Sequence, residues 1–315
     1  MRRAGHVAIG ILALGLAAGT IAGCAALRDR AGPGAVAAGA LGPGDHRVAL
    51  DVGGRRRDYV LHVPAGLPAG PRPLVLELHG GGGTAANIER LTSLQAETDT
   101  HGWLVARPDG VDRQWNDGRP EVRAGIDDVA FLSAVIDDVA TRTPLDPARV
   151  YATGISNGAL MSGRLACELA DRIAAVGQVA GTQGVELAAT CQPSRPVSVL
   201  VISGTAAPLV PYAGGAIGPV LGIGGARGTV LGAEAYVAAW VGRDRAGPPA
   251  TSEVAPDTTV RRYQGASGSE VLFYRVDGAG HTWPGGRQYL PGALVGSTTR
   301  TFSASRVIVD FFAAH

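Results

Sequence analysis

Short apolar runs alternate with stretches of helical periodicity along most of this 315-residue chain. Two runs of alternating apolar and polar residues flank Gly53-Gly54, and this pattern predicts an antiparallel hairpin. Later runs are continuously apolar, which is typical of strands that are buried on both faces of a sheet. The hairpin strands are expected at 47–52 and 58–63, and the buried strands at 73–78, 103–107, 149–153, 174–179, 196–203 and 271–276.

Helical periods fall between these predicted strands. Within 126–141, apolar residues recur at three- and four-residue spacing, so that one face of a helix would be buried. Further helices are expected at 159–170, around Trp240, and at 302–312. Strands that alternate with helices indicate an α/β fold with a mostly parallel central sheet, helices on both faces and an N-terminal antiparallel hairpin. No internal repeat is visible, and we expect a single domain.

A pentapeptide at 154–158, Gly-Ile-Ser-Asn-Gly, lies between a predicted strand and a predicted helix. A serine on such a sharp turn is forced outward from the sheet edge, as in the nucleophile elbow of α/β-hydrolases. The flanking glycines let neighbouring main chain pass closely, because they lack a Cβ. We therefore expect Ser156 to be a nucleophile; the alternative is a tight glycine turn with an idle serine.

A catalytic base must follow the nucleophile along the chain if the triad has the order of α/β-hydrolases, Ser, acid, His. Of the seven histidines, only His281 and His315 come after Ser156. His315 is the last residue, where a side chain is poorly positioned. His281 follows the predicted strand 271–276 and is the expected base; a surface-loop histidine is the alternative.

Main-chain N–H groups are expected to form the oxyanion hole. Asn157 follows the nucleophile and supplies one N–H, and the glycine run after His79 supplies another, expected at Gly81. His79 itself is expected to hold this loop rather than to titrate in catalysis; a plain flexible loop is the competing interpretation. The run is no phosphate-binding P-loop, because no Gly-Lys-Ser or Gly-Lys-Thr closes it.

The N-terminal residues 1–24 predict an export signal. Two arginines precede an uncharged stretch, 7–23, whose apolar core is too short for a comfortable membrane span. The stretch ends in Ile-Ala-Gly-Cys24, which resembles the cleavage box of bacterial lipoproteins, where the cysteine becomes the first mature residue and carries the lipid. An ordinary cleaved signal and an uncleaved anchor are the alternatives. We expect a cell-envelope lipoprotein or a secreted protein.

Residues 25–45 are rich in Ala, Gly and Pro and are expected to form a flexible tether before a catalytic domain at 46–315. Two cysteines remain, Cys167 and Cys191. In an exported protein they are expected to pair as a disulfide, with two buried free thiols as the alternative. Neither has a metal-ligand partner at suitable spacing, and we expect no metal and no cofactor. The formal net charge of +1 provides no field for nucleic acid.

Several strings together resemble the secreted polyhydroxybutyrate depolymerase and feruloyl esterase family of bacterial α/β-hydrolases, which includes actinobacterial lipoprotein esterases. They are LHGGGG at 78–83, RPDG at 107–110, WNDG at 115–118, DDVAFL at 127–132, GISNGALM at 154–161, GTA at 204–206 with VPY at 210–212, and GHTWPGG at 280–286. The resemblance extends from about residue 46 to the end. It implies Ser156 as nucleophile, His281 as base and a Cys167–Cys191 disulfide.

The chain departs from this family at the triad acid. The family pattern is Gly-Thr-Ala-Asp-Pro, whereas 204–208 here read Gly-Thr-Ala-Ala-Pro, so that Ala207 replaces the aspartate. In a serine protease the loss of this carboxylate lowers turnover about ten-thousandfold, or roughly 5 kcal/mol of barrier. Glu186 and Asp277 are candidate substitutes, and a water or a backbone carbonyl that holds His281 is the alternative.

The family resemblance also implies residues of the substrate pocket. Trp115, Asn116 and Asp117 are expected to shape it or to brace its loops, with structural packing an equal alternative for Trp115. His79 and Trp283 are also expected to belong to the pocket. We expect an exported serine esterase of reduced activity; a degenerate hydrolase retained as a binding or scaffold lipoprotein is the alternative. Its partners would be an ester substrate of feruloyl, acetyl-sugar or hydroxyalkanoate type and, through the lipid, the membrane. No polymer-binding module is appended, which favours small or soluble esters.

Overall fold

The computed structural model describes residues 41–66, 70–218 and 226–315, all within one compact unit, Pro33–His315. The expected export signal with Cys24, and residues 25–40 of the expected tether, lie outside the described residues. The first strand begins at Gly44, three residues before the predicted start of this strand at Arg47. Asp45 belongs to it because its carboxylate contacts both His62 and Arg107, which ties the start of the strand to its neighbours.

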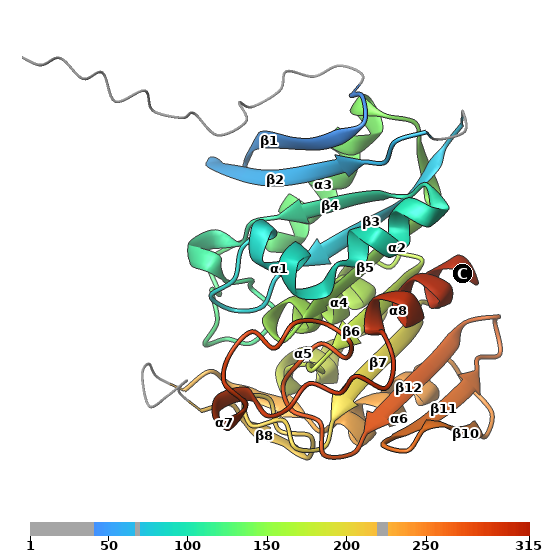
Figure 1. Cartoon of the computed structure of the whole chain (residues 1–315). Helices are drawn as coiled ribbons and strands as arrows, with labels where there is room; N and C mark the ends of the chain where they lie inside the picture. The colour runs from blue at the N-terminus through green and yellow to red at the C-terminus, as the bar shows by residue number, and fades with distance from the viewer. Residues whose placement is uncertain (1–40, 67–69, 219–225) are drawn as a thin grey trace, which may run out of the picture. The chain divides into compact units, whose positions relative to one another are not determined.

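A ten-stranded sheet, counted over the described residues, has the order β1-β2-β4-β3-β5-β6-β7-β12-β11-β10 (Figure 1). Its middle, from β4 to β12, is joined by parallel pairs, and both edges are antiparallel. The predicted mostly parallel sheet is confirmed. The strands are β1 Gly44–Val52, β2 Arg55–Val63, β3 Arg72–Leu78, β4 Leu104–Pro108, β5 Leu145–Ile155, β6 Ala175–Val179, β7 Ser198–Gly204, β10 Ala250–Ala255, β11 Thr258–Gln264 and β12 Glu270–Val276, with β8 Gly214–Ala216 and β9 Thr229–Leu231 in a separate pair.

The N-terminal hairpin is also confirmed. β1 and β2 pair antiparallel, with Val52 opposite Arg55 across the two-residue turn. Gly53 and Gly54 both have positive φ, 58° and 72°. This left-handed main chain matches the twist of the two strands and is accessible to glycine without steric cost.

Helices cover both faces of the sheet (Figure 1). One apolar cluster holds side chains of α3, α4 and α6, and the other holds side chains of α1, α2 and α8. None of the helices in the described part of the chain has the length and apolar character needed to cross a bilayer. The helices are α1 Ala85–Thr92, α2 Leu94–His101, α3 Asp128–Arg142, α4 Asn157–Glu168, α5 Val185–Thr190, α6 Ala233–Arg243, α7 Gly292–Val295 and α8 Ala304–Ala313.

The predicted apolar stripe explains how α3 packs. Leu132, Ile136 and Val139 are buried against the sheet, whereas Val129 is partly exposed. The helix begins after Asp127, whose carboxylate accepts from the N–H of Ala130 at 2.9 Å and so satisfies one of the free donors of the first turn.

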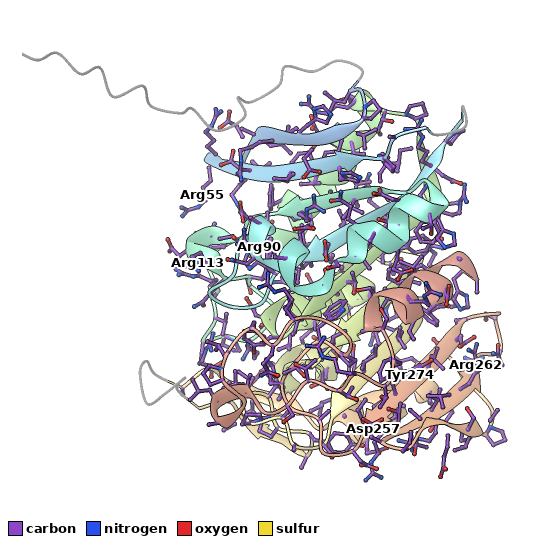
Figure 2. All side chains as sticks on the ribbon, in the orientation of Figure 1. Arg55, Arg90, Arg113, Asp257, Arg262 and Tyr274 are labelled. Carbon is purple, nitrogen blue, oxygen red and sulfur yellow. A yellow bond between two sulfur atoms is a disulfide. The ribbon has the colours of Figure 1, made fainter. Side chains whose placement is uncertain are left out.

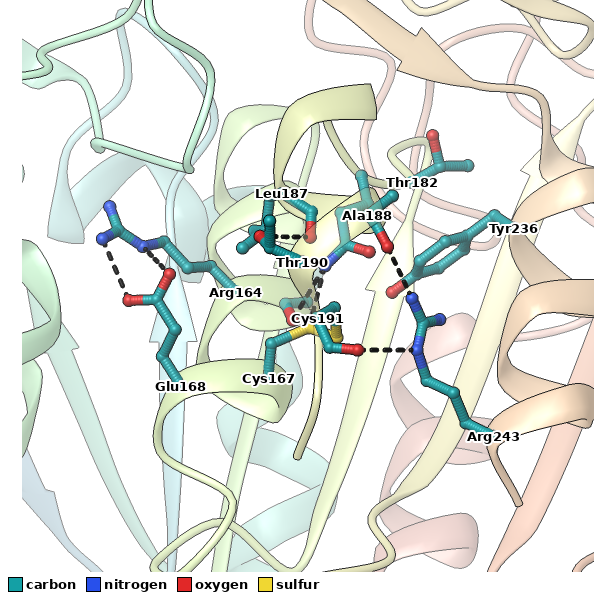
Figure 3. Close-up of a disulfide and its surroundings, with 12 residues drawn as sticks. Arg164, Cys167, Glu168, Thr182, Leu187, Ala188, Thr190, Cys191, Tyr236 and Arg243 are labelled. Atoms are coloured by element: carbon teal, nitrogen blue, oxygen red, sulfur yellow. Dashed lines mark hydrogen bonds and ion pairs between the residues drawn. A yellow bond between two sulfur atoms is a disulfide. The ribbon is translucent and has the colours of Figure 1, made fainter. Parts of the chain in front are cut away.

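A disulfide joins Cys167, at the end of α4, to Cys191, just after α5 (Figure 3). The expected pairing is confirmed. The carbonyl oxygens of Cys191 and Ala188 both accept from the guanidinium of Arg243, at 3.2 and 2.9 Å. α6 is thereby connected to the same bridge, which stiffens the support behind α4.

Four strands end at the same edge of the sheet and carry the candidate residues. β3, β5, β7 and β12 run parallel, so their carboxyl ends meet at this edge, where α/β sheets bind ligands. The strands end at Leu78, Ile155, Gly204 and Val276. The segments that follow them hold the glycine loop, the elbow serine, Ala207 and His281.

Candidate active site

Ser156 lies on a sharp turn between β5 and α4, with φ 57° and ψ −124°. Its N–H donates to the carbonyl of Val179 at 3.0 Å, which ties the turn to the neighbouring strand. A Cβ at Gly154 would lie 2.4 Å from the carbonyl oxygen of Leu78, and one at Gly158 would lie 2.2 Å from the same oxygen. Both glycines are therefore required by close approach of β3, and the local backbone has the form of a nucleophile elbow.

Two N–H groups of the glycine loop after β3, those of Gly80 and Gly81, have no hydrogen-bond acceptor among the described residues. The N–H of Gly82 donates to Arg113 and that of Gly83 donates to Gly80, at 2.7 and 2.9 Å. The N–H of Asn157, at the first position of α4, has no acceptor within the helix. The N–H groups of Gly81 and Asn157 are the two donors expected from the sequence to form an oxyanion hole, and both residues line the same cavity.

His79 holds the glycine loop through both ring nitrogens. The N–H of Gly110 donates to Nε2 at 3.0 Å, so Nδ1 carries the proton and donates to the carbonyl of Gly80 at 2.8 Å. Burial lowers the pKa of the His79 imidazole below its ordinary value, in agreement with this neutral form. The His79 ring therefore holds the loop in place, and both of its nitrogens are hydrogen-bonded.

The side chain of Asn157 locks the start of α4 to the segment after β4. Its oxygen accepts from the N–H of Trp115 at 2.8 Å, and its nitrogen donates to the carbonyl of Trp115 at 3.0 Å and to Asp117 at 2.7 Å. Asp117 also binds the guanidinium of Arg119, and both side chains are buried. The family resemblance placed Asp117 near the catalytic edge, but its hydrogen bond with the side chain of Asn157 was not expected, because Asn157 was assigned only a main-chain role.

His281 follows β12 and is 1% exposed. Its main chain is held on both sides: its N–H donates to Val295, and its carbonyl accepts from the hydroxyl of Tyr289 at 3.0 Å. Its ring is held less well, since Nδ1 is buried and makes no hydrogen bond with any described residue. Burial, with a smaller contribution from the positive charge of Arg227, lowers the pKa of His281 from 6.5 to about 4.

One cavity of about 560 Å³ brings the candidate residues together. Ser156, His281, Gly81 and Asn157 all line it, as does His79. Apolar side chains and four arginines contribute much of its remaining lining. The cavity provides a hydroxyl, a neutral imidazole and two unpaired N–H groups at a single sheet edge, which is a set of groups for acyl transfer.

Ala207 lies in the loop that follows β7. The N–H of Ala206 donates to the carbonyl of Ala279 at 3.0 Å, so this loop is joined directly to the segment that leads to His281. A methyl group offers Nδ1 of His281 no acceptor. The loop position is that of the family's acid, whereas the carboxylate is absent.

Neither candidate substitute acid is a hydrogen-bond partner of the His281 ring in the described structure. Glu186 lies on α5 and lines a different hollow, together with Arg164. Asp277 is half-exposed and pairs with Arg275 at 2.9 Å.

Three residues that the sequence analysis placed in the pocket do not belong to the cavity lining. Trp115 is fully buried and donates through Nε1 to the carbonyl of His79 at 2.9 Å, so that it packs behind the glycine loop. Trp283 is likewise buried and donates to Ser305 on α8 at 3.0 Å. Asn116 donates to the carbonyl of Ile126 at 2.8 Å and lines the hollow that contains Glu186. All three are structural supports because their polar atoms are used within the fold.

Residues 57–193 match the family described as Esterase PHB depolymerase. Over 279 residues the chain is 39% identical to NocK of Nocardia uniformis subsp. tsuyamanensis, a protein named provisionally as an esterase, and the match covers 82% of this chain and 80% of NocK. Over 166 residues it is 32% identical to feruloyl esterase B of Piromyces equi, which covers 50% of this chain and 31% of that protein.

Among solved structures, the acetyl xylan esterase from Aspergillus awamori has a TM-score of 0.55 at 14% sequence identity, over 82% of this chain and 94% of that chain. A likeness at this identity supports the fold alone. The sequence matches also show the family, since the relationship to NocK spans most of both chains. The chain therefore belongs to the polyhydroxybutyrate depolymerase family of esterases, within the α/β-hydrolase fold.

Proposed function

We propose that this protein is an exported serine esterase that cleaves carboxylic esters through an acyl-enzyme. One observation carries the proposal: Ser156 on its elbow, His281 and the unpaired N–H groups of Gly81 and Asn157 line the same cavity. Membership of an esterase family supports ester hydrolysis as the reaction.

In the proposed reaction the Ser156 hydroxyl attacks the ester carbonyl while Nε2 of His281 takes its proton. The carbonyl oxygen becomes an oxyanion held by the N–H groups of Gly81 and Asn157. The tetrahedral intermediate then expels the alcohol, which receives the proton from His281. In the second half of the reaction, water attacks the acyl carbon while His281 takes a proton from it. The intermediate then breaks down, the Ser156 oxygen receives the proton from His281, and the carboxylic acid leaves.

The proposed enzyme is impaired because nothing orients the imidazole through Nδ1. In a serine protease the aspartate at this place holds the imidazole in the reactive tautomer and stabilises its charged form. Here residue 207 is an alanine, and Nδ1 has no partner among the described residues. Serine, base and oxyanion donors still support catalysis above the uncatalysed rate.

Short-chain p-nitrophenyl esters test the proposal. The purified domain is expected to release p-nitrophenol and to be labelled by a fluorophosphonate probe, and Ser156→Ala is expected to lose the label. A protein that neither hydrolyses the esters nor takes the label would instead be a degenerate hydrolase with a binding or scaffold role. The unpartnered Nδ1 of His281 is the observation that favours that second candidate.

Small or soluble esters are the proposed substrates, of feruloyl, acetyl or short hydroxyalkanoate type. The names of the feruloyl esterase relative and of the polyhydroxybutyrate depolymerase family, together with a cavity of about 560 Å³, support the feruloyl and hydroxyalkanoate part of this range. Screening matched esters of these three acids against the purified domain tests it.

Export and lipid attachment at Cys24 are proposed from the N-terminal pattern, and the Cys167–Cys191 disulfide supports an oxidising compartment. Metabolic labelling with a fatty acid is expected to mark the full chain and not Cys24→Ser. Unlabelled protein in the culture medium that lacks the N-terminal signal would point to an ordinary cleaved signal.

A further inference from the structure

The lining of the cavity around Ser156 carries an excess of positive charge. Four arginines line it, whereas no Asp or Glu does among its described lining residues. Arg90 projects from α1 (Figure 2), and the other three are Arg119, Arg227 and Arg287. An excess of positive charge in a partly enclosed space attracts anions and disfavours cations.

One of the four arginines is already neutralised. Arg119 is 3% exposed and donates through both Nε and Nη2 to the carboxylate of Asp117, which is fully buried. Its Nη1 donates to the main-chain carbonyl of Arg227. Arg119 therefore serves to position residue 227.

Arg227 is different, because its guanidinium makes no hydrogen bond or ion pair with any described residue. Partial burial, together with the positive charge of Arg119, lowers the pKa of Arg227 below its ordinary value. The negative charge of Asp117, which is already paired with Arg119, opposes this shift only in part, so the Arg227 guanidinium is a half-buried cation without a direct anionic partner among the described residues.

The position of Arg227 brings this cation to the reacting groups. Its Nη2 would lie 3.1 Å from a Cβ built on Gly81, so the guanidinium lies against the proposed oxyanion loop. Its charge also acts on the imidazole of His281. The main chain of Arg227 is held by the carbonyl of Ile217 as well as by Arg119, so the side chain starts from a fixed point.

We propose that Arg227 binds a carboxylate group of the substrate, so that this esterase prefers esters that carry a negative charge close to the scissile bond. The proposal rests on the proposed esterase function. Arg90 and Arg287, which are exposed and make no ion pair with a described residue, add attraction at the rim of the cavity. A guanidinium and a carboxylate fit through two parallel hydrogen bonds, which gives orientation as well as affinity.

A direct role of Arg227 on the oxyanion of the intermediate is the competing assignment. The N–H groups of Gly81 and Asn157 already fill that role, and an oxyanion donor would not require further arginines at the rim. The two assignments differ in a measurable way: an oxyanion donor accelerates charged and neutral esters alike, whereas a carboxylate site favours charged esters only.

Two matched pairs of esters test the proposal on the full mature protein. Mono-p-nitrophenyl adipate and its terminal amide place the charge on the acyl side, and 4-acetoxybenzoate and 4-acetoxybenzamide place it on the alcohol side. We expect the charged member of at least one pair to have the higher kcat/KM. Arg227→Gln should lower that charged-to-neutral ratio by about 10- to 100-fold, as for hydrogen bonds to charged groups.

Arg56→Gln is the matched control, because Arg56 lies exposed on the β2 hairpin strand and does not line the cavity. It removes the same formal charge and should leave both ratios unchanged. A ratio that Arg227→Gln does not alter in either pair overturns the proposal, and an equal loss for charged and neutral esters assigns Arg227 to the oxyanion.

Direct binding separates this inference from the proposed function. On Ser156→Ala protein, titration calorimetry with 4-acetoxybenzoate and 4-acetoxybenzamide should show tighter binding of the acid, and adding Arg227→Gln should remove the difference. If no ester is hydrolysed and the fluorophosphonate does not react, the esterase function fails while this measurement still decides the carboxylate site. Equal binding of acid and amide overturns it.

Discussion

On one side of the cavity both polar atoms of the Asn157 side chain are hydrogen-bonded, whereas on the other side Nδ1 of the His281 ring has no partner among the described residues. The elbow side is fixed by main chain and by the buried Asp117–Arg119 pair. The base side fixes the main chain of His281 and leaves its ring without an acceptor. The nucleophile and the proposed oxyanion donors are thus held by backbone geometry. The orientation of the imidazole, in contrast, would need a carboxylate that Ala207 does not supply.

Restoring the carboxylate at residue 207 should give the His281 ring a hydrogen-bond partner and so remove most of the difference between the two sides of the cavity. Ala207→Asp is expected to raise kcat on p-nitrophenyl esters by about 10³- to 10⁴-fold, or roughly 4 to 5 kcal/mol of barrier, because it supplies the acceptor for Nδ1. Ala207→Asn has the same shape without the charge and is expected to give far less. Steady-state kinetics of the two variants measures the difference; no gain from the aspartate would mean that another group already orients His281.

Breaking the support on the elbow side should cost stability. Asp117→Ala leaves the buried guanidinium of Arg119 unpaired and removes an acceptor from Asn157, so the free energy of unfolding is expected to fall by about 3 to 5 kcal/mol. Asp137→Ala is the control: it breaks an ion pair with Arg172 in which the aspartate is 68% exposed, and about 1 kcal/mol or less is expected. Urea unfolding midpoints compare the two, and equal losses would contradict a special role for the buried pair.

Removing the nucleophile should have a smaller effect in the natural chain than in the restored one. Members of a triad act as a unit, so Ser156→Ala is expected to lower kcat by only about 10²-fold, or roughly 3 kcal/mol, when the acid is absent. In the Ala207→Asp background the same substitution should cost about 10⁵-fold or more. Rates on p-nitrophenyl butyrate for the four proteins measure both steps. Equal losses in the two backgrounds would mean that residue 207 does not act with Ser156.

The pH profile should report the state of the imidazole. His281 must be neutral to accept a proton, and its pKa is lowered to about 4, so kcat/KM of the natural chain should fall only as the pH drops through about 4. A carboxylate beside the ring favours its charged form, so Ala207→Asp should move this acidic limb upward by about 1 to 3 pH units. A limb at the same pH in both proteins would argue that the introduced carboxylate makes no contact with His281.

Residues of the elbow and its neighbours could be read from the chain because their geometry is local. Gly154 and Gly158 must lack a Cβ where β3 passes, and a positive φ at Ser156 belongs to the strand-to-helix turn itself. The central strands were equally visible, since burial on both faces demands continuous apolar runs. β10 was missed for the opposite reason: almost all of its residues are exposed, at the edge of the sheet, so no apolar pattern marks it.

The sequence by itself predicted the α/β class, the N-terminal hairpin, the central strands with the helices α3, α4, α6 and α8, the elbow, the glycine loop, one candidate base and the cysteines that form the disulfide. These follow from backbone sterics, apolar periodicity and chain order, all of which act over short stretches. Only the tertiary structure decided that Trp115 and Trp283 lie behind the cavity, that Asn157 is held by Asp117, and that Arg227 lies beside Gly81 without a partner among the described residues. Those relations join side chains from loops far apart in the chain, where partner and direction depend on how the whole sheet edge is packed.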